Sequence, residues 1–285
     1  MRNDARELDE IQRIANAAQT RLDIYRTIHK ALRALLSDTL VAVGRMDVHD
    51  ALELAQTTQR TLQMLDFMRS HLGHENTFIH PALEARSPGA SGRIADDHID
   101  HESEIDALAA AATGLLNLRA EERDAAALVL YHRLSLFVAH NFEHMHVEES
   151  AHNSALWAHY TDAELVDLHN RLVASIPPEE MMFCMRWMVP FMNPGERAAV
   201  LADMRAHAPA PAFAAVLEMV RPHLQAREWD KLMAALGSAG TANAPEDRPT
   251  GCGELSARAG RARSAAARTA AASGSSTCAG RPARF

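Results

Sequence analysis

The sequence is poor in cysteine and in aromatic residues. It has three Cys among 285 residues, and aromatic side chains make up 5% of the chain. Cys184, Cys252 and Cys278 are too far apart for a CxxC metal knuckle, and their number does not suggest a disulfide framework. We therefore expect neither a thiolate zinc site nor a disulfide-stabilised fold, and a reducing cytoplasm fits this composition.

Long apolar runs are also missing. No run approaches the ~20 residues that a membrane-spanning helix needs, and the opening MRNDARELDE lacks the apolar region of a secretory signal. The net charge of -8 argues against a general nucleic-acid surface. Phosphate-cradling glycine loops and nucleophile elbows are absent as well. We expect a cytoplasmic protein that binds neither membranes nor nucleic acids.

What the sequence has in abundance is residues that favour helices. Ala, Leu, Arg and Glu lose little conformational entropy in a helix, and apolar residues recur at helical spacing. We therefore predict an all-α fold, with an antiparallel four-helix bundle over 1–175. One or two helices are expected over 8–43, and single helices from a cap at Asp47 to about 86, at 93–118 and at 121–158.

Two further regions follow the predicted bundle. Thr161 and Glu164 form a capping-box pattern that predicts another helix. Residues 176–237 are expected to form a smaller helical appendix, with a methionine-rich packing face. Residues 238–285 contain seven Arg and three acidic residues but almost no large apolar side chains, so we predict a disordered tail.

Histidine is the unusual residue: there are 16, and fourteen lie between positions 29 and 169. His71 and Glu75 are four residues apart, which places them on one helix face. His140, His144 and Glu148 repeat that spacing on a later helix. Each of these helices can therefore present imidazole and carboxylate donors to one metal site.

The other two predicted helices also offer histidines. His98 and His101 are three residues apart, and His29 lies in an apolar stripe. Taken alone, such a histidine is usually a core or surface residue, and we interpret His80 and His152 as helix-end or surface residues. Candidates on four successive helices are the pattern by which helical bundles build metal sites. Imidazole with carboxylate suits iron or zinc.

Three segments resemble the hemerythrin-like, or HHE, cation-binding family: HLGHENTFIHPALEAR, HIDHESEI and HNFEHMHVEESAHNSALW. The resemblance covers about 20–160. It implies two non-haem iron ions with an oxo or hydroxo bridge, held by five histidines and two carboxylates that leave one position open. The ligands so implied are His29, His71, Glu75, His101, His144 and Glu148, with the two glutamates able to bridge the ions.

The fifth histidine stays open, and His98 completes our predicted set. His49, His74 and His140 are the alternatives. His49 precedes His71 by 22 residues, roughly 33 Å along a continuous helix at ~1.5 Å per residue, so it can reach the site only if the intervening chain is not helical.

The resemblance implies a protein that binds a small diatomic ligand, O2 or NO, for sensing, storage or stress response. The alternative is a di-iron oxidoreductase, or an iron donor in nitrosative or oxidative stress and iron–sulfur cluster repair. An iron buffer is a third reading. We favour a ligand-binding protein over an enzyme, with a protein partner or homodimer contact through 176–237.

Overall fold

A computed structural model describes residues 5–18 and 20–241 of the chain. Every regular element in these ranges is a helix and none is a strand, so the predicted all-α class is confirmed. The α-helices are α1 (Ala5–Ala17), α2 (Arg26–Arg45), α3 (Ala51–His74), α4 (His80–Arg86), α5 (Gly92–Leu115), α6 (Ala120–Val147), α7 (Asn153–His159), α8 (Asp162–Ser175), α9 (Pro178–Phe191), α10 (Pro194–His207), α11 (Ala210–Val220) and α12 (Ala226–Thr241).

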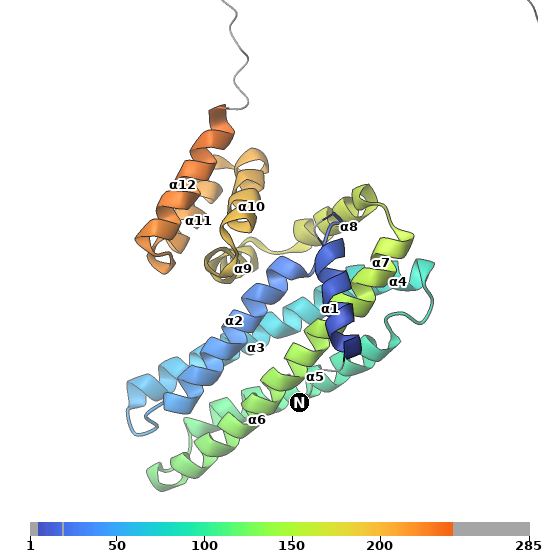
Figure 1. Cartoon of the computed structure of the whole chain (residues 1–285). Helices are drawn as coiled ribbons and strands as arrows, with labels where there is room; N and C mark the ends of the chain where they lie inside the picture. Colours follow the sequence, from blue (N-terminus) through green and yellow to red (C-terminus); the bar gives the residue numbers. More distant parts are fainter. Residues whose placement is uncertain (1–4, 19, 242–285) are drawn as a thin grey trace, which may run out of the picture. The chain divides into compact units, whose positions relative to one another are not determined.

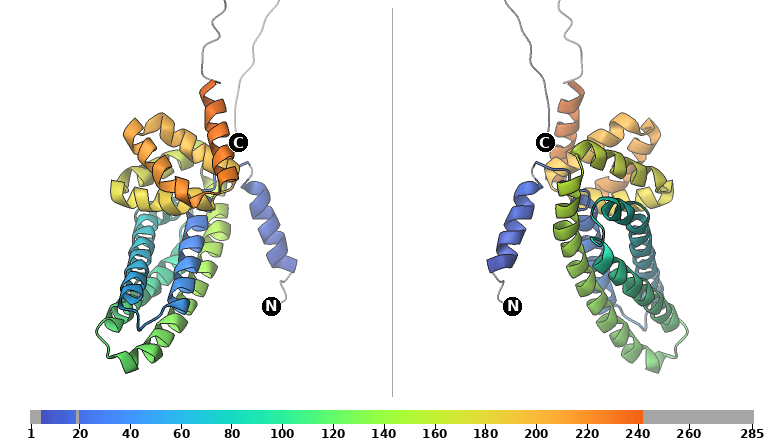
Figure 2. Two further views of the ribbon diagram at one scale, coloured as in Figure 1. Left: turned by 90° about the vertical axis from the view of Figure 1, so that its left-hand side faces the viewer. Right: turned by 90° about the vertical axis from the view of Figure 1, so that its right-hand side faces the viewer.

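Four long helices, α2, α3, α5 and α6, surround the main core. α2 contacts α3 and α6, and α5 contacts the same two helices. Figures 1 and 2 show the four lying alongside one another. None of the described helices is both long and apolar enough to span a bilayer.

The start of α3 differs from the prediction in its cap. Asp50, not Asp47, accepts hydrogen bonds from the backbone N–H groups of Leu52 and Glu53, at 2.9 and 3.0 Å. Asp47 instead accepts from the N–H of His49 within the preceding turn. Both are short acidic side chains near the helix start, and the local turn decided which one satisfies the free N–H groups. The predicted Thr161 capping box is confirmed at the start of α8.

Two helices that the sequence predicted to be continuous each contain a π-helical segment. One covers Glu75–Ile79 between α3 and α4, and the other covers Glu148–His152 between α6 and α7. A π segment closes hydrogen bonds five residues apart, so it adds a residue to the turn and often occurs at functional sites. Here each begins at a glutamate that we predicted to be a metal ligand.

Apolar side chains from the four helices fill the main core. The repeat predicted in α2 buries Leu32, Leu35 and Leu36, and Phe137 of α6 is the largest side chain that is fully enclosed. The polar candidate ligands therefore lie in a molecule whose interior is otherwise largely apolar.

The last four helices have a core of their own, which includes Val189, Leu201 and Val220. α9 connects this core to α2, because Cys184 and Trp187 belong to the main core. α12 continues to Thr241, beyond the boundary predicted at 237. The remainder of the predicted disordered tail, 242–285, lies outside the described residues, and the division into a bundle, an appendix and a tail stays a prediction.

Removing a core side chain from α2 should destabilise the protein strongly. Leu35 is 1% exposed, so Leu35→Ala should lower the free energy of unfolding by about 2–5 kcal/mol through lost burial and a residual cavity. Val41 on the same helix is 62% exposed, and Val41→Ala should change it by less than about 0.5 kcal/mol. Denaturant unfolding followed by circular dichroism measures both, and equal effects would contradict this core assignment.

Candidate metal centre

All seven predicted ligands are buried, with at most 9% of any residue exposed. One comes from α2, one from α3, two from α5 and one from α6, and each π segment contributes its first residue. In that order they are His29, His71, His98, His101, His144, Glu75 and Glu148.

A first group of donors is formed by His29, His71, Glu75 and Glu148, whose ligand atoms all lie within 4.8 Å of one another. Nε2 of His71 is 3.2 Å from Oε1 of Glu75. Nε2 of His29 is 3.9 Å from that oxygen and 3.4 Å from Oε2 of Glu148. Two imidazoles and one oxygen of each carboxylate therefore face a common point.

A second group uses the other oxygens of the same glutamates. Nε2 of His98 is 3.5 Å from Oε2 of Glu75, and Nε2 of His144 is 3.4 Å from Oε1 of Glu148. The two imidazole nitrogens are 3.1 Å apart. Glu75 and Glu148 thus lie between two pairs of histidines, with one carboxylate oxygen directed toward each pair.

Several of these buried donor atoms have no hydrogen-bond partner that would offset the free-energy cost of burying them. Both oxygens of Glu75 and of Glu148, and Nε2 of His29 and His71, are unpartnered. An unsatisfied buried polar group costs about 1–3 kcal/mol, and a buried charge costs more. A cation between the carboxylates would supply the missing interactions, and the residues present therefore fit a metal site.

The electrostatics divide the four imidazoles of the two donor groups. Burial opposes protonation of His29 and His144, but hydrogen bonds to nearby glutamates and their charges outweigh it, so the pKa of His29 is raised to about 9 and that of His144 is raised as well. Burial, together with the positive charge of neighbouring histidines, lowers the pKa of His71 to about 3 and that of His98 to about 2. Neutral imidazole is the form that coordinates metals. Burial and the charge of Glu148 raise the pKa of Glu75, whereas for Glu148 the nearby imidazoles of His144 and His29 outweigh burial and lower it. The two carboxylates repel each other unless a cation lies between them.

Outer residues orient two of the imidazoles. Nδ1 of His29 is 3.0 Å from Oε1 of Glu149, which also accepts from Arg33 at 2.6 Å. Nδ1 of His98 is 2.8 Å from Oδ1 of Asn76. Such contacts hold Nδ1 as the N–H donor and leave Nε2 free to bind a metal.

His101 belongs to neither donor group, although we predicted it as a ligand. Its ring centroid is 4.9 Å from that of His144, and its Nδ1 is buried without a partner. It lines a surface pocket of about 460 Å³ between α5 and α6, together with His140 and His144. His101 therefore lies next to the second group, on the outer side of His144, and its role as a ligand stays a prediction.

The three alternatives for the fifth histidine lie outside the groups as well. His49 is exposed and interacts with Asp124 at 3.2 Å. His74 is 3.7 Å from Glu180, and His140 is exposed. Of the four residues considered for this place, His98 is the one that the structure brings to the glutamates.

Our interpretation of His80 and His152 as surface or helix-end residues was wrong. They are 7% and 1% exposed and form a third donor group with Glu148. His152 continues the i, i+4 series of His144 and Glu148, a signal present in the sequence. His80 follows Glu75 by five residues, about 140° away on an α-helix. The intervening π segment brings it back to the same side.

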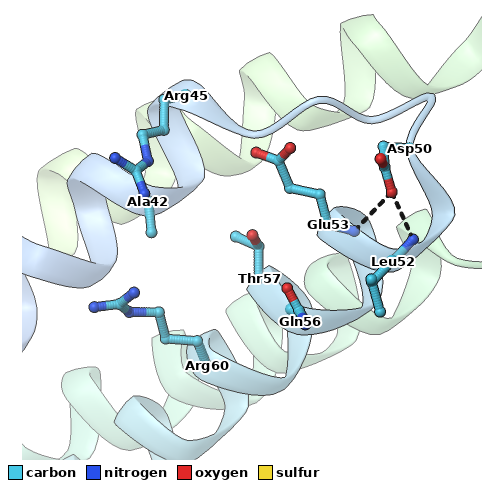
Figure 3. A pocket seen from close by; sticks show the side chains of 8 residues that line it. All are labelled: Ala42, Arg45, Asp50, Leu52, Glu53, Gln56, Thr57 and Arg60. Atoms are coloured by element: carbon cyan, nitrogen blue, oxygen red, sulfur yellow. Dashed lines mark hydrogen bonds between the residues drawn. The ribbon is translucent and has the colours of Figure 1, made fainter.

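A second pocket, of about 470 Å³, contains none of the candidate ligands. Arg45 and Ala42 of α2 line it together with Glu53, Thr57 and Arg60 of α3 (Figure 3). Arg45 follows His29 by 16 residues on α2, roughly 24 Å at ~1.5 Å per residue. This pocket is therefore remote from the buried donors.

Divalent metal should stabilise the metal-free protein. Binding to the folded state alone contributes about 4 kcal/mol at a thousand times Kd, so Fe²⁺ or Zn²⁺ should raise Tm by several degrees. Glu148→Ala removes a residue shared by all three donor groups and should abolish the rise, while His49→Ala should keep it. Thermal unfolding by circular dichroism measures this. A wild-type Tm that does not change when metal is added would contradict the assignment of a metal site.

Loss of the outer carboxylate should weaken metal binding without removing a donor. Glu149→Gln takes away the charge that orients His29, and such changes typically reduce affinity by about 10–100-fold. Glu143→Gln is a matched control, because Glu143 has a side chain 70% exposed and paired with Arg93. Competition with a chelator gives both affinities. Equal affinities in the two variants would show that Glu149 does not act on the centre.

Comparison with known proteins agrees with the donor geometry. Residues 20–152 match a family model described as the Hemerythrin HHE cation binding domain, whereas no curated protein and no solved structure matches the chain. The matched segment includes all seven predicted ligands and ends at His152, the last residue of the second π segment. The resemblance expected from the three motifs is therefore confirmed: residues 20–152 match the model of the hemerythrin HHE cation-binding domain.

Proposed function

We propose that this protein holds two iron ions within an antiparallel four-helix bundle of α2, α3, α5 and α6 and uses them to bind a small diatomic ligand, O2 or NO. One observation carries the proposal: Glu75 and Glu148 each direct one oxygen toward each pair of histidines. Two carboxylates placed in this way can bridge two cations. His29 and His71 would hold one ion, and His98 and His144 the other, with His101 next to His144.

The donor types support iron. The two groups offer imidazoles and carboxylates, the combination found at non-haem iron centres with open positions. The described residues place no thiolate among them, since Cys184 is buried elsewhere in the main core. Iron would supply reversible ligand binding and redox chemistry, and the protein supplies a buried site with oriented donors.

The number of donors leaves room for an exogenous ligand. Four imidazole nitrogens and four carboxylate oxygens do not fill the coordination spheres of two six-coordinate ions, even with His101 added. The donors are almost fully buried, so the ligand must be small. A pocket lined by His101 and His144 reaches the second donor group.

An oxidoreductase or an iron donor would use the same residues and differ in turnover. For a binding protein we expect a stable adduct, and for an oxidoreductase we expect continued consumption of the diatomic in the presence of a reductant. A protein partner or homodimer contact through 176–237 is a separate proposal. Part of that region already faces α2, because α9 packs there.

Iron-loaded protein should contain two irons per chain and develop a charge-transfer band when the reduced form meets O2 or NO. His71→Ala and Glu148→Ala should lose the band, and His49→Ala should retain it. Metal analysis and visible absorption measure these results. Iron well below one per chain, or no spectral change with either gas, would overturn the proposal; steady consumption of gas with reductant would favour the oxidoreductase.

A further inference from the structure

His80 and His152 are buried beside the proposed centre but belong to neither pair. His80 is the first residue of α4 and follows one π segment, and His152 is the last residue of the other. Their ring centroids are 5.7 Å apart, with the rings at 90°. The ring of His80 also stacks on that of His98, at 4.8 Å. The two π segments therefore bring two further imidazoles to one side of the glutamates.

Each of these rings brings a nitrogen close to a carboxylate oxygen of Glu148. Nε2 of His80 and Nε2 of His152 are buried and make no hydrogen bond. One ligand atom from each, with one oxygen of Glu148, falls within 4.8 Å. Two imidazoles and a carboxylate oxygen are a donor set for a transition-metal ion.

The hydroxyl group of Tyr25 contacts the other ring nitrogen of His152, Nδ1. Its hydroxyl oxygen is 3.2 Å from Nδ1 of His152, and the residue is 2% exposed. If the Nδ1–H of His152 donates to the phenol oxygen, Nε2 keeps its lone pair on the side of Glu148. This is the arrangement by which outer groups orient a metal-binding histidine.

We propose that His80, His152 and Glu148 form a third cation position, adjoining the proposed iron pair and suited to a divalent transition ion such as Zn²⁺ or Co²⁺. The inference rests on the proposed function in that Glu148 is shared with the pair. Because this position has three donors with one carboxylate, whereas each of the other two has four donors with two carboxylates, it binds an ion more weakly than they do. It is a place for an additional ion, not a replacement for the pair.

The test is the number of Co²⁺ or Zn²⁺ ions bound by the metal-free full chain, from equilibrium dialysis with metal analysis. Wild type should bind three per chain, the third at least tenfold more weakly. His80→Phe and His152→Phe keep an aromatic ring but remove the donor, and should bind two. His146→Phe is the matched control on α6, half-buried and outside every donor group, and should bind three. Tyr25→Phe should weaken only the third ion, by about 10–100-fold.

Other outcomes separate this inference from the proposed function. Two ions in wild type and in both Phe variants would overturn the third position and leave the pair intact. Loss of a tightly bound ion in His80→Phe or His152→Phe would place that residue in the pair and also overturn it. No binding in wild type would overturn both proposals. Helicity and Tm are checked for every variant, and His80→Gln and His152→Gln replace any Phe variant that does not fold.

Discussion

Glu75 and Glu148 face each other between the helices. Their buried negative charge is the constraint on which the rest of the site depends. Both side chains are almost completely enclosed, and neither carboxylate has a hydrogen-bond partner. Without compensation such a pair opposes folding through desolvation and mutual repulsion. Without metal, the raised pKa values of His29 and His144 compensate part of this charge, and bound cations would compensate it more fully. Metal binding and the stability of this part of the molecule are therefore coupled.

The π segments explain how so many donors share so small a space. Each begins at one of the two glutamates, so the helix changes its pitch at the residue that lies between the histidine pairs. An uninterrupted α-helix would direct His80 away from Glu75. The wider π turn has less favourable hydrogen-bond geometry than an α-helix, and it places the imidazole of His80 on the side of the centre. Both π segments therefore begin at a candidate ligand, whereas the histidines of the two donor groups come from regular α-helices.

The C-terminal helices also touch the chain next to the candidate ligands. Lys30 and Arg26 form ion pairs with Glu196 at the start of α10, on either side of the α2 turn that carries His29. On α3, Ser70, the residue before His71, donates a hydrogen bond to Glu180 of α9. Through these contacts, α9 and α10 bind to α2 and α3, the two helices that carry the histidines of the first donor group. The outer helices thus help to hold that group in position.

Much of this protein was already determined by its sequence. Helix-forming composition and apolar spacing indicated the all-α class, and the i, i+4 pairs His71–Glu75 and His144–Glu148 placed donors on single helix faces, because that periodicity is a local property of the backbone. Tertiary structure decided the rest. It brought His98 rather than His49 to the glutamates, left His101 one layer outside, and buried His80 and His152, since these outcomes depend on which helices meet and on π turns that local spacing does not reveal.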